Sequence, residues 1–164
     1  MKVKDVIQSL EELAPQAYAE GFDNTGLLVG DVQTEVSGIL VTLDTLEAVV
    51  DEAIAANCNL IVSFHPIIFK GLKKITGKTY VERVILKAIK NDIAIFAIHT
   101  ALDNAWNGVN AMICEKLGLT HRSILIPQEG TIHKLTTFVP SEKAAAVREA
   151  LFAAGAGNIG NYSH

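Results

Sequence analysis

The sequence predicts an α/β fold with a mostly parallel or mixed sheet, and three observations support this class. Short runs rich in β-branched residues alternate with segments that repeat apolar residues at helical spacing. The 164 residues suffice for one globular domain, or for one domain and part of another. Apolar residues make up 49% of the chain and charged residues 20%, which indicates a large core and excludes a disordered chain.

The expected elements follow this alternation along the chain. Apolar residues at positions 3, 7, 10 and 13 favour a first helix, which Pro15 ends, and Gly118 closes the last helix of the series. We expect helices at residues 2–13, 45–57, 80–90 and 109–117, and strands at residues 26–30, 38–44, 60–65 and 93–99. Because strands alternate with helices, most strands are expected to run parallel.

A change of composition at residues 127–130 (P-Q-E-G) indicates a second domain. Beyond it, residues 134–139 have the pattern of a strand and residues 141–154 that of a helix, with Ser141 as its N-cap. One strand and one helix cannot bury their apolar faces without partners. We therefore expect an α/β domain at residues 1–128 and the beginning of a truncated second domain at residues 129–164.

Composition also narrows the location and the partners. The longest apolar stretches, such as residues 93–98, are far shorter than a membrane span, and the first residues lack the apolar segment of a secretory signal. Cys58 and Cys114 have no C-x-x-C partner, which favours buried free thiols in a reducing compartment. A net charge of −4 with 14 Lys and Arg argues against a nucleic-acid surface. We expect a cytoplasmic protein without membrane or nucleic-acid partners.

The strongest candidate site lies at the ends of two expected strands. His65 ends one strand, and His99 ends another with Asp103 four residues further on in the loop, where the carboxyl ends of strands open onto the ligand crevice of α/β sheets. Pro66 sets the turn directly after His65. Imidazole and carboxylate ligands suit zinc, iron, manganese or nickel. The alternative is that each histidine is a hydrogen-bonded structural residue.

Three segments resemble the NGG-one-interacting-factor-three-like family, whose members are labelled GTP cyclohydrolase 1 type 2 homologues. D-N-T-G-L-L-V-G at residues 23–30 resembles the family's D-N-x-G-L signature, and H-P-I-I-F at residues 65–69 resembles its H-H-P-x-x-F motif. His99 and Asp103 match its H-x-x-x-D motif. The resemblance implies a two-metal site with His65, His99 and Asp103 as ligands, hence one or two divalent ions per chain. It also implies ring-shaped homohexamers.

Two departures from the family pattern bear on this site. Phe64 stands where the family has the first of two adjacent histidines, so one ligand is lost because phenylalanine has no lone pair to donate. The family supplies a further His and Glu from its C-terminal part, and this chain ends before such a segment. Residues 134–164 resemble the start of the ferredoxin-like, P-two-like domain that longer members carry, and His164 belongs to that segment.

Other polar residues have competing interpretations. Asp23 is expected to form a turn, with a place near the site as the alternative, and Asp44 is expected to cap the following helix.

The G-L-K-K-I-T-G-K-T stretch at residues 71–79 has five residues between its glycines, whereas the phosphate-loop pattern has four, so it does not match that pattern. Its lysines are either a solvated loop or an attractor for an anionic substrate. Trp106 either stacks on a ligand or wedges its loop.

Two functions remain open from the sequence. The first is a metal-dependent hydrolase acting on a small molecule, such as a nucleotide or another phosphorylated compound, in which metal ions activate water. The second is a metal-binding regulatory or assembly protein without turnover. Phe64 and the similarity to a ligand-sensing inserted domain favour the second.

Overall fold

The computed structural model describes residues 1–127, 134–159 and 162–163, which fall into two compact units, Met1–Arg122 and Ser123–His164. The first unit is built on a four-stranded sheet with the order β1-β4-β3-β2. Its strands are β1 (Gly26–Val29), β2 (Ile39–Thr42), β3 (Leu60–Ser63) and β4 (Ala94–Ala97). β2, β3 and β4 run parallel, and β1 is antiparallel to β4. The predicted α/β class with a mixed sheet is confirmed.

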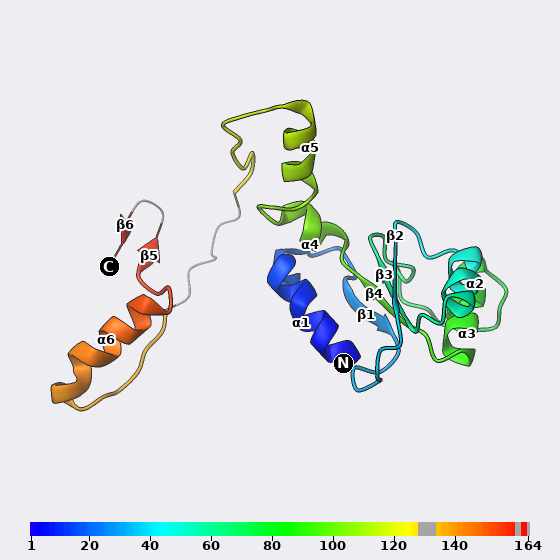
Figure 1. Cartoon of the computed structure of the whole chain (residues 1–164), viewed down its shortest axis with the longest axis horizontal. Coiled ribbons are helices and arrows are strands. Elements are labelled where there is room, and N and C mark those ends of the chain that lie inside the picture. The colour runs from blue at the N-terminus through cyan, green and yellow to red at the C-terminus, as the bar shows by residue number, and fades with distance from the viewer. Residues whose placement is uncertain (128–133, 160–161, 164) are drawn as a thin grey trace. The chain divides into compact units, whose positions relative to one another are not determined.

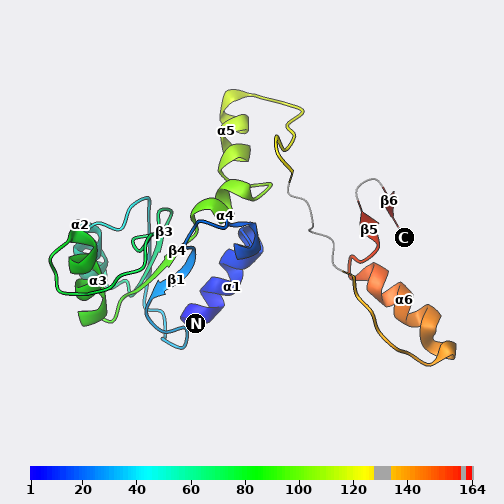
Figure 2. The same cartoon turned by 180° about the vertical axis from the view of Figure 1, so that it is seen from behind.

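Helices cover both faces of this sheet. α1 (Val3–Leu13) lies on one face, and α2 (Glu47–Ala55) and α3 (Tyr80–Lys90) lie on the other (Figures 1 and 2). Successive residues of a strand point to opposite faces, so the central strands contribute to two cores. The core under α1 includes Val3, Val6, Leu60, Val62 and Phe96. The core under α2 and α3 includes Val50, Ile61, Val84, Ile85 and Ile95.

Two further helices follow β4. α4 (His99–Asn104) begins at the candidate ligand His99, and α5 (Val109–Leu117) ends at Gly118, whose φ of 67° is left-handed. A Cβ at Gly108, between the two helices, would lie 1.8 Å from the carbonyl oxygen of Leu102, so only glycine fits there. The loop expected after His99 is wrong, because α4 begins at His99 and includes Asp103. The helices expected at residues 80–90 and 109–117 have those same bounds.

The second unit contains η2 (Ser141–Lys143), α6 (Ala144–Ala153) and an antiparallel pair, β5 (Asn158–Ile159) with β6 (Tyr162–Ser163). The strand expected at residues 134–139 is wrong, because no described strand pairs with them. Ser141 does not cap a helix, since it lies inside η2 and the N-cap of α6 is Lys143. The expected boundary between residues 128 and 129 lies outside the described residues, as does His164.

The helices among the described residues are short, and the longest have 11 residues. None combines the length and the apolar character that crossing a bilayer demands. Cys58 and Cys114 are both free thiols, and each is half-buried where full burial was expected.

Candidate metal site

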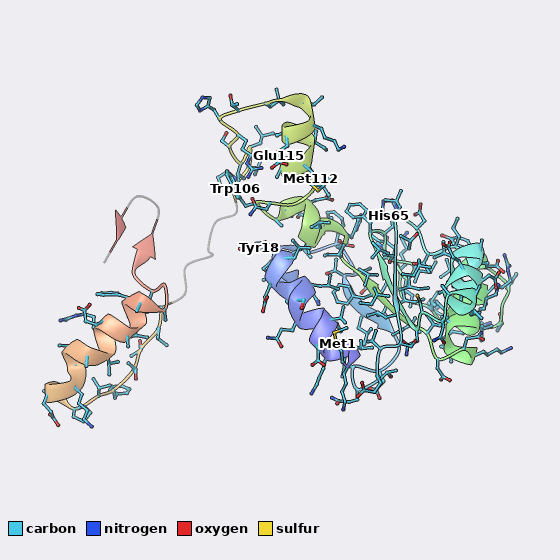
Figure 3. All side chains as sticks on the ribbon, viewed as in Figure 1. Met1, Tyr18, His65, Trp106, Met112 and Glu115 are labelled. Atoms are coloured by element: carbon cyan, nitrogen blue, oxygen red, sulfur yellow. The ribbon has the colours of Figure 1, made fainter. Side chains whose placement is uncertain are left out.

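The candidate site lies at one edge of the sheet, where four chain segments meet. The parallel strands β2, β3 and β4 all end at this edge, and Asp44, His65 and His99 follow them within two residues. Figure 3 shows His65 beyond the strand ends. β1 is antiparallel and begins at the same edge, since Gly26 pairs with Ala97. Asp23, three residues before Gly26, therefore comes to the same place from the opposite direction along the chain.

Backbone and side-chain contacts hold His65 at the ends of β2 and β3. Its N–H donates to the carbonyl of Leu43 at 2.9 Å, which continues the pairing of β3 with β2. The hydroxyl of the fully buried Ser63 donates to the His65 carbonyl at 3.0 Å. The ring Nδ1 lies 2.7 Å from Oδ1 of Asp44, and both side chains are about half-exposed. His65 therefore has a fixed backbone and one solvent-accessible carboxylate partner.

His99 is held in a more enclosed setting. Its φ of 29° is left-handed, which is strained for a residue with a side chain, and its N–H donates to the carbonyl of Phe64 at 3.0 Å. The ring Nδ1 lies 2.9 Å from both carboxylate oxygens of Asp23. Asp23 also accepts hydrogen bonds from the backbone N–H of Asn24 at 2.7 Å, the backbone N–H of Thr100 at 3.2 Å and the Thr100 hydroxyl.

The Asp23 carboxylate is kept ionised by this setting. Its side chain has no exposed surface, and burial by itself raises the pKa of a carboxyl. Hydrogen bonds from Thr100, His99 and Asn24 outweigh burial and lower the pKa of Asp23 below its ordinary value. A buried carboxylate with this many donors holds its neighbours in place.

The two imidazoles approach each other closely. Their ring centroids are 5.5 Å apart, and the ring of Phe64 lies edge-on to both, with centroids 5.1 Å from His65 and 5.4 Å from His99. Two imidazoles bound to one tetrahedral ion through nitrogens about 2 Å from it would have centroids about 5 Å apart. The observed spacing thus fits two nitrogens that share one ion.

Asp103 is the third predicted ligand, and its position differs from that of the histidines. It lies one turn after His99 on α4, half-buried, and its carbonyl accepts a hydrogen bond from Asn110 at 2.9 Å. Across residues 1–127 and 134–157, no three His, Cys, Asp or Glu side chains gather closely enough to hold an ion. The structure therefore brings His65 and His99 together without the Asp103 carboxylate, and the three-ligand set stays a prediction.

Two carboxylates of the site were given other roles from the sequence. Asp44 does not cap α2, whose N-cap is Leu46 without a side-chain bond, but contacts His65 instead. Asp23 does more than form a turn, because it binds His99 and Thr100 from 76 and 77 residues away. The available signal for Asp44 was its position at the end of a strand parallel to that of His65. The signal for Asp23 was its place in the D-N-x-G-L motif.

The lysine-rich loop before α3 is closed by a carboxylate of the same chain. Glu82 accepts hydrogen bonds from the backbone N–H and hydroxyl of Thr76, at 2.8 and 2.7 Å, from the N–H of Lys78 at 3.1 Å and from the Thr79 hydroxyl at 3.2 Å. The hydrogen bonds from Thr76 are the main reason why the pKa of Glu82 falls to about 2. The donors that would cradle a phosphate are thus occupied, while four lysine side chains stay exposed: Lys70, Lys73, Lys74 and Lys78.

Trp106 lies at the surface just beyond α4 and is labelled in Figure 3. Its ring packs under the guanidinium of Arg122, 4.8 Å from the ring centroid. Much of the indole remains exposed, so the choice between stacking on a ligand and wedging the loop stays open.

Comparison with known proteins decides the family. The sequence model of the Duf34/NIF3 (NGG1p interacting factor 3) family matches residues 1–163. The chain belongs to the Duf34/NIF3 family. The predicted resemblance is confirmed, and the mixed sheet with helices on both faces is the form that this family's fold takes here.

Three relatives give the extent of the match within the Duf34/NIF3 family. The chain is 43% identical over 162 residues to the GTP cyclohydrolase 1 type 2 homolog of Bacillus subtilis, covering 98% of this chain and 43% of that protein. The Staphylococcus aureus protein of the same name is 38% identical, and the match covers 100% of this chain and 44% of that protein. A crystal structure of a Bacillus cereus protein related to NIF3 matches with a TM-score of 0.81 and 40% identity, covering 100% of this chain and 45% of that one. The chain thus spans less than half the length of these relatives.

Proposed function

We propose that this chain of the Duf34/NIF3 family binds a divalent metal ion through His65 and His99 and acts as a metal-dependent hydrolase. One observation carries the proposal. The two rings lie 5.5 Å apart, each Nδ1 contacts a carboxylate, and neither Nε2 has a hydrogen-bond partner among the residues that the structure describes. Two such nitrogens at the carboxyl ends of adjacent parallel strands are suited to hold an ion there.

The residues of the chain have distinct roles in this proposal. His65 and His99 hold the ion, and Asp103, one helical turn beyond His99, is the proposed third ligand. Imidazole with carboxylate suits zinc, iron, manganese or nickel, with one or two ions per chain. A divalent ion supplies Lewis acidity and lowers the pKa of water, so that hydrolysis proceeds at neutral pH.

The proposed substrate is a small anionic molecule, such as a nucleotide or another phosphorylated compound. The loop that follows His65 exposes Lys70, Lys73, Lys74 and Lys78, whose charges raise the local concentration of anions. The relatives named GTP cyclohydrolase 1 type 2 homologs also favour a nucleotide. Replacing both Lys73 and Lys74 with alanine is expected to raise KM for such a substrate at low salt. An unchanged KM would argue against this role.

Metal content measured by elemental mass spectrometry tests the site. We expect about one ion per chain in the unaltered protein, and we expect the ion to be lost in His65→Ala and in His99→Ala. His121→Ala is the matched control, because His121 is an exposed histidine of the same unit outside the site. Equal metal content in all four proteins would contradict the proposed ligands. Release of product from a panel of nucleotides, abolished by a chelator and restored by the metal, would then support hydrolysis.

A regulatory or assembly protein without turnover is the second candidate. Phe64 favours it, because an apolar ring lies against both imidazoles and donates no lone pair. Such a protein would bind metal and form homo-oligomers, with hexamers as the proposed state, yet release no product. Metal bound at full stoichiometry with no turnover on any substrate of the panel would favour this function.

A further inference from the structure

We propose that Asp23 is a positioning residue, which holds His99 in the tautomer protonated at Nδ1 and leaves Nε2 as the nitrogen with the free lone pair. The inference deepens the proposed metal site and rests on it for its functional meaning. The tautomer itself is a property of the chain without metal. It can therefore be tested separately.

The contacts of Asp23 carry this inference. Both of its oxygens lie 2.9 Å from Nδ1 of His99, and a carboxylate accepts hydrogen bonds but does not donate them. Nδ1 must therefore bear the hydrogen. Nε2 of His99 has no hydrogen-bond partner in the described part of the chain, so nothing competes for its lone pair.

The surroundings of Asp23 prevent it from turning away. Oδ1 also accepts the Asn24 N–H, and Oδ2 accepts the N–H and the hydroxyl of Thr100. Thr100 follows His99 directly, so the same carboxylate holds the backbone and the ring of the first turn of α4. These hydrogen bonds help to maintain the left-handed φ of 29° at His99.

Asp44 offers a comparison within the same molecule. It also contacts Nδ1 of a histidine, His65, but its side chain is 52% exposed while that of Asp23 is 0% exposed. Asp44 uses one oxygen for one contact, and water competes for it. We therefore expect Asp23 to determine a single tautomer of His99, and Asp44 to bias that of His65 only weakly.

The variant Asp23→Ala tests this assignment by removing both acceptors of the Nδ1 hydrogen. Asparagine would not, because its amide oxygen could still accept from Nδ1 and its NH₂ would face the Asn24 N–H or the donors of Thr100. Without the carboxylate, the hydrogen is no longer confined to Nδ1, and Nε2 becomes protonated in part or all of the molecules. A protonated Nε2 has no lone pair for a metal ion.

Long-range ¹H–¹⁵N spectra of the metal-free chain report the tautomer directly. They are recorded at about pH 9, where imidazoles are neutral, and the His99 signals are assigned by their loss in His99→Gln. We expect the unaltered chain to show the hydrogen on Nδ1 of His99, and Asp23→Ala to show it on Nε2 in part or all of the molecules. Asp44→Ala is the control, since it removes a carboxylate at the edge of the site and should leave the His99 tautomer unchanged.

The outcomes separate this inference from the proposed function. An unaltered chain with His99 protonated at Nε2, or as an even mixture, would overturn the inference without any variant. An unchanged tautomer in a folded Asp23→Ala chain would also overturn it. Titration with Zn²⁺ tests the consequence for metal binding, with affinity expected to fall 10- to 100-fold in Asp23→Ala. Zn²⁺ binding by neither protein would contradict the proposed metal site and leave the tautomer assignment standing.

Discussion

Phe64 lies against both imidazole rings of the candidate site, with ring centroids 5.1 and 5.4 Å away. Its carbonyl accepts the N–H of His99, so its backbone links the end of β3 to the start of α4. The residue therefore has two separable roles. The backbone fixes the spacing of the histidines, and the side chain makes the space between them apolar.

Replacing Phe64 with histidine should increase metal binding. The backbone contact is independent of the side chain, and the new imidazole adds a nitrogen ligand beside the two existing ones. We expect elemental mass spectrometry to give more metal per chain, or competition with a chelator to give tighter binding. Phe64→Leu is the control, because it keeps an apolar side chain. Metal content equal in Phe64→His and Phe64→Leu would show that this position does not face the ion.

Glu82 is expected to make the stability of the folded chain depend on pH. Hydrogen bonds from Thr76, Lys78 and Thr79 lower its pKa from 4.5 to about 2. Because the pKa is lower in the folded chain, the contribution of Glu82 to stability is present above about pH 4.5 and is lost as the pH falls toward about 2.

Urea unfolding of Glu82→Gln and of the unaltered chain tests this pH dependence. The difference between their urea midpoints should be largest at about pH 6 and should become smaller below about pH 4. Glu12→Gln, at an exposed glutamate on α1, is the control and should give no such difference. A difference in midpoint between Glu82→Gln and the unaltered chain that is the same above and below about pH 4 would contradict the role of the Glu82 charge.

At the scale of elements, the junction of α4 and α5 positions half of the site. α4 carries both His99 and Asp103, and α5 contacts it through a short turn that contains Gly108. A Cβ at Gly108 would meet the carbonyl oxygen of Leu102, an atom of the α4 backbone, at 1.8 Å. Because a backbone carbonyl cannot move aside as a side chain does, α4 itself would have to shift.

Gly108→Ala should therefore weaken both stability and metal binding. We expect the free energy of unfolding to fall by about 1–3 kcal/mol, as overpacked sites do, with a parallel loss of metal affinity because His99 moves with α4. Gly71→Ala is the control, since a Cβ at Gly71 meets nothing within 4 Å. The control should change stability by no more than about 0.5 kcal/mol. Equal unfolding curves for the two variants would contradict the close approach at Gly108.

At the scale of the whole molecule, the buried core belongs to the first unit. Every buried hydrophobic residue among those described lies between Val3 and Ala111, and α6 of the second unit has none. Stability of the first unit is therefore expected to depend little on residues 123–164.

A chain ended after Arg122 tests this independence. We expect it to unfold cooperatively in urea, at a midpoint close to that of the 164-residue chain, when followed by circular dichroism. The control is the same deletion combined with Leu60→Ala, which should lose about 2–5 kcal/mol because Leu60 is fully buried in the core. A gradual, non-cooperative transition of the 1–122 chain would show that the second unit is needed for the first.

Much of this architecture follows from local sequence patterns. Helical spacing of apolar residues and runs of β-branched residues predict α1, α3 and α5 with their bounds nearly unchanged, and the sheet strands to within a few residues. The errors occur where neighbours in space decide the structure. Residues 134–139 have the pattern of a strand but no partner strand, and residues 99–103 follow a strand but turn into α4.

The sequence by itself determined the α/β class, the family and the pair His65 and His99, because these depend on periodicity and on short motifs with fixed spacing. Only the tertiary structure decided which carboxylate serves each ring. Asp44 is 21 residues from His65, and Asp23 is 76 residues from His99, and no local pattern encodes contacts at such separations. They arise because the parallel strands end, and the antiparallel β1 begins, at the same edge of the sheet.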